Sequence, residues 1–149
     1  MSSSLLLDEI IDTEADYSQI VQRIKQMMPN FCVFLMRGDL AAGKTTFVRY
    51  FAESYGLVTS QSPTYSIHQC YSNDQVTIDH IDLYRLNSIE EVDSSGFWDL
   101  FQERDRVIFI EWSERIRHED WPLDRSYLIL DFSLKNSKRR LRVLRGLES

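Results

Sequence analysis

Residues Gly38–Thr45 fit the pattern G-x-x-x-x-G-K-[ST], which is typical of a loop that binds the phosphates of a nucleotide. In such a loop the backbone N–H groups surround the phosphates, and a lysine places a positive charge on the outer ones. Lys44 is that lysine here, and the hydroxyl of Thr45 is expected to bind Mg²⁺. No [NT]-K-x-D segment, which would read guanine, occurs in the chain, so we expect ATP or ADP. The expected nucleotide contacts are Gly38, Asp39, Leu40, Ala41, Ala42, Gly43, Lys44 and Thr45.

A second anchor for Mg²⁺ is needed in nucleoside triphosphatases, usually an acid at the end of a neighbouring strand. Val107–Ile110 is a short apolar run that predicts a buried strand, and Glu111 follows it directly. We therefore expect Glu111 to share Mg²⁺ with Thr45, directly or through a bound water. The alternative is an ordinary surface glutamate at a strand end.

His80 and Asp82 close another predicted strand, and the alternation of a strand places both on one face. Asp82 is a candidate to orient a water, join the Mg²⁺ shell or act as a base. His80 is either part of the site or a core histidine satisfied by backbone. Arg85 is either a phosphate contact or half of a structural ion pair. Thr64 is a candidate hydroxyl for sensing the γ-phosphate, unless its segment is a plain proline-containing turn.

The elements that hold these residues follow from apolar periodicity and helix signals. Phe31–Met36 reads as a strand buried on both faces, and the helix after Lys44 ends near Gly56. Thr13 is the predicted N-cap of an earlier helix, with Asp16 in the capping-box position and Pro29-Asn30 at its end. Further strands are expected at Leu5–Ile11, Tyr65–Tyr71, Val76–Leu83, Tyr127–Phe132 and Arg140–Leu144, and an interrupted helix at Asn87–Leu100.

Together these elements predict an α/β fold, a P-loop NTPase-like sandwich with a mixed, partly parallel central sheet flanked by helices. The length of 149 residues suits a single domain over residues 1–149. Cys32 and Cys70 are expected to pack in the core rather than form a disulfide. Neither a signal peptide nor a membrane span is apparent, so a cytoplasmic location is expected. The net charge of −6 argues against a broad nucleic-acid surface, DNA included.

One basic stretch, Lys138–Arg145, stands out in this acidic chain. From Arg140 it alternates basic and apolar residues, as a half-buried strand does. We favour an edge strand protected from aggregation by its charges. The alternative is a docking face for an acidic partner or RNA.

Several segments together resemble one family, the bacterial tRNA threonylcarbamoyladenosine biosynthesis ATPase TsaE. The resemblance covers roughly Thr13–Pro122, and its most specific parts are the His-x-Asp-x-Tyr-Arg segment and the Glu-Trp pair. The matching residues are Gly38-Asp39-Leu40, Ala42-Gly43-Lys44-Thr45-Thr46-Phe47-Val48-Arg49, Ser62-Pro63-Thr64-Tyr65, His80-Ile81-Asp82-Leu83-Tyr84-Arg85-Leu86, Ile110-Glu111-Trp112 and Glu114-Arg115. Ala41 departs from the family by replacing a glycine.

The resemblance implies a small Mg²⁺-dependent ATPase that works with a TsaD–TsaB complex in the modification of adenosine 37 of tRNAs reading codons that start with A. Its ATP cycle would reset that complex, and tRNA would be met only indirectly. Lys44 would hold the outer phosphates, while Asp82 and Thr64 would respond to the γ-phosphate. Trp112 would pack beside the site and Thr13 would approach the adenine. The implied catalytic residues are Lys44, Thr64, Asp82 and Glu111, and Thr46 joins the nucleotide contacts.

Two other functions remain open from the residues alone. A small-molecule kinase would need an acceptor pocket and usually an arginine-bearing lid, and no long insertion supplies one. A nucleotide-gated binding module would use ATP only to order Ser62–Tyr65 for a partner.

Overall fold

The computed structural model describes residues 4–38, 43–59, 68–86 and 88–146. The strands are β1 (Ser4–Ile11), β2 (Val33–Arg37), β3 (His68–Ser72), β4 (Thr77–Asp82), β5 (Val107–Glu111), β6 (Tyr127–Lys135) and β7 (Lys138–Gly146). The α-helices are α1 (Glu14–Met27), α2 (Lys44–Glu53) and α3 (Ile89–Ser94). Short 3₁₀ segments are η2 (Leu83–Arg85), η3 (Phe97–Gln102), η4 (Ser113–Arg115) and η5 (His118–Asp120).

One sheet of seven strands in the order β1-β7-β6-β2-β5-β4-β3 forms the centre of the fold. β2 runs parallel to both β5 and β6, and β4 runs parallel to β5. The outer pairs β3–β4, β6–β7 and β1–β7 are antiparallel. The predicted mixed, partly parallel sheet with flanking helices is therefore confirmed.

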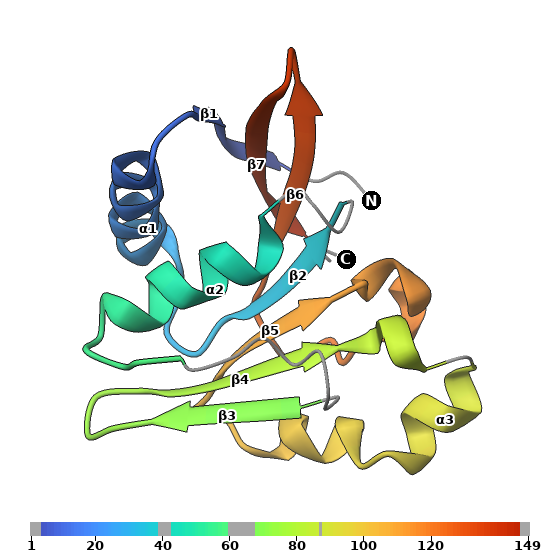
Figure 1. Ribbon diagram of the computed structural model, residues 1–149. Helices are drawn as coiled ribbons and strands as arrows, with labels where there is room; N and C mark the ends of the chain where they lie inside the picture. Colours follow the sequence, from blue (N-terminus) through green and yellow to red (C-terminus); the bar gives the residue numbers. More distant parts are fainter. Residues whose placement is uncertain (1–3, 39–42, 60–67, 87, 147–149) are drawn as a thin grey trace.

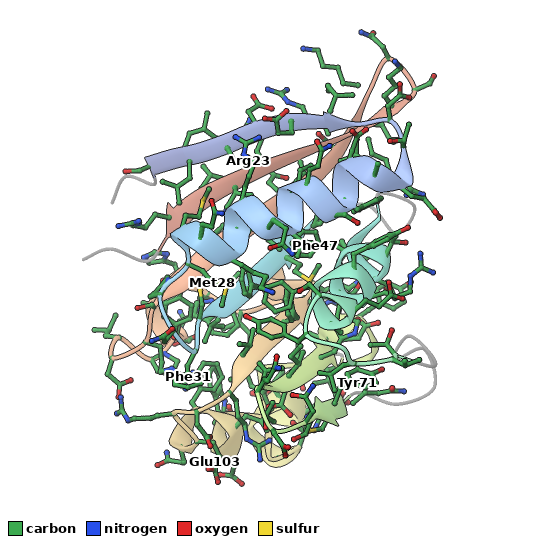
Figure 2. All side chains as sticks on the ribbon, turned by 90° about the vertical axis from the view of Figure 1, so that its left-hand side faces the viewer. Arg23, Met28, Phe31, Phe47, Tyr71 and Glu103 are labelled. Carbon is green, nitrogen blue, oxygen red and sulfur yellow. The ribbon has the colours of Figure 1, made fainter. Side chains whose placement is uncertain are left out.

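Each face of the sheet has its own apolar core. α1 and α2 pack on one face, where Phe34, Phe47, Phe51 and Phe109 are fully buried and their rings contact one another. Figure 2 shows Phe47 inside this layer, between α2 and the sheet. On the other face, α3 and the 3₁₀ segments cover β2, β4 and β5 near the lower end of Figure 1. None of the helices in the described ranges is both long and apolar enough to span a membrane.

The first helix begins as its sequence predicts. Thr13 is the N-cap of α1, and the Asp16 carboxylate accepts hydrogen bonds from the backbone N–H groups of Asp12 and Thr13, at 2.8 and 2.9 Å. These two bonds lower the pKa of Asp16, because they favour its charged form. The cap therefore fixes where the chain leaves β1 and enters the helix above the sheet.

Two expectations about the strands are wrong. β7 is not an edge strand, because it pairs with β1 on one side and β6 on the other, which leaves β1 and β3 at the edges. Cys32 is buried as expected, but Cys70 is exposed. Its strand, β3, pairs on one side only, so its side chains have less cover. The expected residues Tyr65 to Ile67 of this strand, and Asn87, lie outside the described residues.

A buried ion pair ties β4 to the start of β5. The Asp79 carboxylate is fully buried, and Arg106 donates to both of its oxygens at 3.2 Å, while His68 contacts it at 2.6 Å. Burial raises the pKa of Asp79, but the hydrogen bonds from His68 and Arg106 outweigh that effect and lower it below its ordinary value. The carboxyl therefore stays ionised inside the protein.

Replacing Arg106 with alanine should lower the free energy of unfolding by about 3 kcal/mol, because it strips a buried carboxylate of its guanidinium partner. Asp79 has a lowered pKa, so its stabilising contribution exists above the ordinary carboxyl pKa and disappears as the pH falls through the lowered one. The loss should therefore be largest near neutral pH in urea unfolding. Arg104→Ala is the control, since the Arg104–Asp124 pair is exposed and its loss should cost less than about 1 kcal/mol. Equal losses in the two variants would contradict the assigned role of Asp79.

Candidate nucleotide site

Two glycines, Gly38 and Gly43, lie on either side of the undescribed part of the predicted phosphate loop, at positions where a side chain does not fit. Gly38 follows β2 with φ of 127°, and a Cβ there would lie 2.2 Å from the Phe132 carbonyl oxygen. Gly43 has φ of 100°, and its Cβ would lie 2.4 Å from the Tyr17 hydroxyl oxygen. Both positions therefore exclude L side chains on conformation and on space. The expected contacts Asp39, Leu40, Ala41 and Ala42 lie outside the described residues.

Lys44 begins α2 and points its ammonium group into the site. The side chain is 1% exposed, and Nζ donates to the Gly38 carbonyl at 2.7 Å. Nζ also lies 4.3 Å from the centre of the Trp112 ring. These contacts are a carbonyl and an aromatic ring, with no carboxylate among them, so the positive charge remains available to a phosphate.

The Glu111 carboxylate meets side chains from two other elements. Thr45 Oγ1 donates to Glu111 Oε2 at 3.2 Å, and His80 Nε2 lies within hydrogen-bond distance of the same oxygen. His80 and Glu111 are both buried, on the adjacent parallel strands β4 and β5. The two residues expected to share Mg²⁺ are thus side by side. Of the two interpretations of His80, the structure favours the site, because its partner is a carboxylate rather than backbone.

Asp82 lies opposite Glu111 in the register of β4 and β5. Its carboxylate accepts from the backbone N–H of Tyr84 at 2.9 Å. Burial is the main cause that raises the pKa of Asp82, and the neighbouring charge of Glu111 adds to it. The backbone hydrogen bond and the charges of His80 and Lys44 act in the opposite direction. A carboxyl whose charge is disfavoured in the free protein is suited to respond to a charge that arrives.

Trp112 forms a wall of the site directly after Glu111. Its backbone is left-handed, with φ of 62°, and its ring lies 5.0 Å from the ring of Tyr84. The indole N–H is buried and has no hydrogen-bond partner among the described residues. Because a buried donor without a partner is costly, this group is a free donor beside Lys44. Trp112 thus lies where it was expected, next to the phosphate loop.

A cavity of about 280 Å³ opens beside Gly43, between the start of α1 and the β6–β7 hairpin. Thr13 lies on its wall, with Tyr17 and Arg139. Arg139 Nη1 donates to the Tyr17 hydroxyl at 2.8 Å, and both side chains adjoin the space that a Cβ on Gly43 would fill. The sequence analysis missed Tyr17 and Arg139 as site residues. The sequence feature that could have indicated Arg139 is the basic stretch Lys138–Arg145, which contains it.

The donor set fits Mg²⁺ that arrives with a nucleotide. Within the described ranges, no group of three or more His, Cys, Asp and Glu side chains is placed to hold a metal by itself. Mg²⁺ at phosphate sites is commonly held by one or two carboxylates together with substrate phosphates. The hydroxyl of Thr45 and the carboxylate of Glu111 are such a partial set. Thr46 is half-buried in the same first turn of α2, whereas Thr64 and the Arg85 side chain lie outside what the structure describes.

Replacing Asp82 with asparagine should stabilise the free protein at neutral pH, raising Tm by about 2 °C, because the amide keeps the cap to Tyr84 without a half-buried charge. A carboxyl with a raised pKa stabilises the fold fully below its ordinary pKa and loses that contribution as the pH rises through the raised value. The gain should therefore vanish at acid pH, where the wild-type carboxyl is also neutral. Thermal unfolding across pH checks this, with the exposed Asp105→Asn as control. A variant less stable than wild type at neutral pH would contradict the assigned cost.

Comparisons with known proteins identify the family. The sequence model of one family, threonylcarbamoyl adenosine biosynthesis protein TsaE, matches residues 11–142. The tRNA threonylcarbamoyladenosine biosynthesis protein TsaE of Aquifex aeolicus is 31% identical over 145 residues, which cover 95% of this chain and 98% of that protein. The protein of the same name from Rickettsia felis is 35% identical over 114 residues, 73% of this chain and 64% of that longer protein.

The fold has a solved counterpart in Bacillus subtilus YdiB, with a TM-score of 0.66 and 23% identity. The match covers 97% of this chain and 88% of that one, which shows a shared fold. The family match spans the elements that carry the site, from the end of β1 into β7. The chain therefore belongs to the TsaE family.

Proposed function

We propose that this protein is a Mg²⁺-dependent ATPase that acts with a TsaD–TsaB complex in threonylcarbamoylation of adenosine 37 of tRNAs reading codons that start with A. The observation that carries the proposal is the contact between Thr45 and Glu111 beside the buried Lys44. The names of the relatives support the pathway. In this proposal the protein acts in the cytoplasm, resets the complex between turnovers and meets tRNA only through it.

Each side chain at the site has a distinct part in this proposal. Bound Mg²⁺–ATP supplies the phosphoanhydride bond that is broken. Lys44 would hold the β- and γ-phosphates, and Thr45 and Glu111 would hold Mg²⁺. His80 would orient the Glu111 carboxylate, through the contact that it makes in the structure. Asp82 would respond to the γ-phosphate, as would Thr64.

Hydrolysis by the isolated chain should be slow. Phosphoryl transfer needs positive charge at the transition state, which an arginine often supplies in cis or in trans. Arg115 donates to the Leu86 carbonyl, and Arg139 donates to the Tyr17 hydroxyl. Arg115 is held by a backbone carbonyl, and Arg139 lies beside Gly43 rather than beside the Thr45–Glu111 contact, so we infer that the partner supplies the missing charge at the γ-phosphate.

The pure chain should hydrolyse ATP faintly, and adding a TsaD–TsaB complex should raise the rate by at least about tenfold, since an arginine supplied in trans is worth ~10³–10⁵ in rate. Phosphate release measured with and without the complex checks this, with Lys44→Ala as the blank. Fast hydrolysis by the chain alone would contradict partner activation. A Glu111→Gln variant that binds ATP and keeps full pathway activity would favour a nucleotide-gated module. Transfer of phosphate from ATP to a metabolite would favour a kinase.

Arg139→Ala should weaken ADP binding by about tenfold, because it removes a cationic donor from the cavity beside Gly43. Arg140→Ala is the matched control: it is the next residue along β7, its side chain pairs with Asp8, and ADP affinity should stay within about twofold. Calorimetric titration of both variants with ADP gives the comparison. Equal affinities for wild type and Arg139→Ala would place the nucleoside outside this cavity.

A further inference from the structure

One face of β1, β7 and the second half of β6 has no helix over it in the described ranges, whereas the start of β6 is covered there, since Tyr127 and Ile129 pack with Trp121 in the second core. Along β7, Leu141 and Val143 are buried in the core beneath α1, so the alternating residues Arg140, Arg142 and Leu144 point to the opposite side of the sheet. In Figure 1, α1 lies on one side of these strands, and α3 lies at the far end of the molecule near β3 and β4. Across the described ranges, this side of β1 and β7 therefore stays uncovered by helix.

We call this surface the open face. Its side chains on β1, β7 and β6 include Asp8, Ile10, Asp131, Arg140, Arg142 and Leu144. The sheet register places Asp8, Arg142 and Asp131 in one row across the three strands. Arg37 of β2 continues that row next to Asp131.

Arg142 lacks a full set of partners in this row. It is half-buried, and its Nε is fully buried without a hydrogen-bond partner among the described residues. By contrast, Arg140 forms a two-bond pair with Asp8 at 2.8 and 2.6 Å. A buried donor without a partner costs free energy, so the Arg142 side chain is not fully satisfied by the chain's own groups in the described ranges.

The charges of the open face are opposite to those of the whole chain. Along the strands its cations are Arg37, Lys135, Lys138, Arg140 and Arg142 and its anions are Asp8 and Asp131, a surplus of three positive charges (5 − 2) on a chain of net charge −6.

Two features of the open face favour a protein over RNA. Ile10 is 40% exposed, and Leu5 is 56% exposed at the margin of β1, so the surface also offers apolar area. The carboxylates of Asp8 and Asp131 lie among the cations and would repel a phosphate backbone. A mixed, mildly basic surface with apolar residues is typical of a protein contact.

The open face is also connected to the phosphate loop. Gly38, the first residue of that loop, packs so closely on Phe132 of β6 that a Cβ would lie 2.2 Å from the Phe132 carbonyl oxygen. Asp131 and Ser133, which flank Phe132, point to the open face by strand alternation. A molecule seated there would press on the strand that supports the start of the loop.

We propose that the open face docks a protein surface that presents carboxylates around an apolar patch. This inference rests on the proposed function, because it takes that protein to be the TsaD–TsaB complex. Arg142 and Lys135 would meet the partner's carboxylates, and Leu5 and Ile10 its apolar patch.

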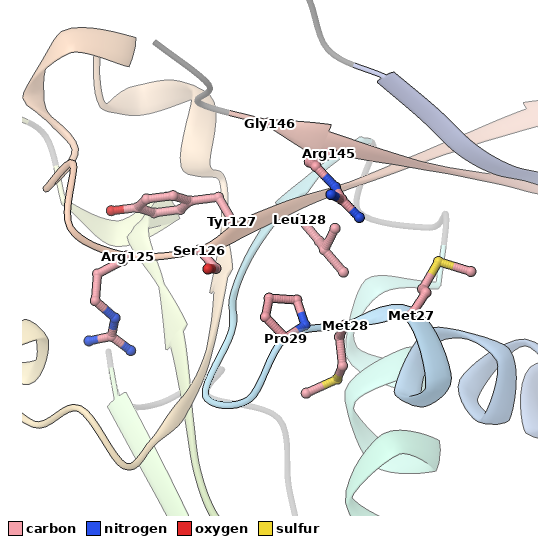
Figure 3. Close-up of a pocket in the computed structure, with 9 residues that line it drawn as sticks. All are labelled: Met27, Met28, Pro29, Arg125, Ser126, Tyr127, Leu128, Arg145 and Gly146. Carbon is pink, nitrogen blue, oxygen red and sulfur yellow. The ribbon is translucent and has the colours of Figure 1, made fainter.

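The test is the affinity of the full chain, with ATP and Mg²⁺, for a TsaD–TsaB complex. Arg142→Glu should weaken binding by at least about tenfold, because it places a third carboxylate in the row and opposes the partner's charge. Arg145→Glu is the matched control: it is the same reversal on the same strand, and Figure 3 shows Arg145 on the opposite side, near Met27 of α1. The control should bind within about twofold of wild type.

Folding and nucleotide binding are measured separately. Arg142→Glu should keep the ADP affinity of wild type, since Arg142 lies across the sheet from the nucleotide cavity. If Arg142→Glu does not fold, Lys135→Glu carries the test alone, because Lys135 is exposed near the β6–β7 turn and its reversal should also weaken binding.

Other outcomes overturn the inference in distinguishable ways. Wild-type affinity in all variants would place the partner elsewhere and leave the proposed function standing. Salt-sensitive binding of tRNA by the chain alone, lost in Arg142→Glu, would make the open face an RNA surface. A dimer that Arg142→Glu dissociates, with unchanged partner affinity, would assign the face to a second copy of this chain. No binding of the wild-type chain to TsaD–TsaB would overturn the proposed function itself and this inference with it.

Discussion

The buried carboxylate of Glu111 is the interaction on which the candidate nucleotide site depends. A carboxylate in the interior needs partners, and Glu111 takes them from Thr45 of α2 and His80 of β4. One charged group therefore fixes the first turn of α2 over the ends of two parallel strands. Because that turn also carries Lys44, the position of this lysine follows from the same contact. α2, β4 and β5 meet at this point because β2, which leads into α2, lies next to β5, and β5 lies next to β4.

The charges of Lys44 and Asp82 are only partly balanced by other groups in the free protein. Lys44 is buried against a carbonyl and an aromatic ring, while Asp82 carries a pKa raised by burial and by its acidic neighbour. Such an arrangement is less favourable for the free chain than a neutral one would be. Under the proposed function, phosphates at Lys44 and a cation at the carboxylates would balance these charges, so binding and stability would be linked at the same side chains. By comparison, the Asp79–Arg106 pair is balanced within the protein and supports the fold alone.

The parts that sequence analysis predicted are those with local signals. The helix that begins at Lys44, the strand before Glu111 and the cap at Thr13 are each set within a few residues, and the structure has them where expected. The contact of His80 with Glu111 joins residues 31 positions apart, and no local pattern encodes it. The place of β7 was mistaken for a related reason. Alternating basic and apolar residues suit an edge strand, but they suit an interior strand with one uncovered face equally well, and only the pairing with β1 decides between them.

Because β7 lies between β1 and β6, its side chains contribute to two different surfaces of the protein. Successive side chains of a strand point to opposite faces, so Arg139 reaches the cavity beside Gly43 while Arg140 and Arg142 reach the open face. The nucleotide cavity and the open face are therefore separated by the thickness of a single strand. Leu141 and Val143 alternate with these arginines and are fully buried, so β7 is fixed in the core at the same positions. Because β7 is paired with β1 on one side and with β6 on the other, it also holds in place the strand whose Phe132 packs against Gly38 at the start of the loop.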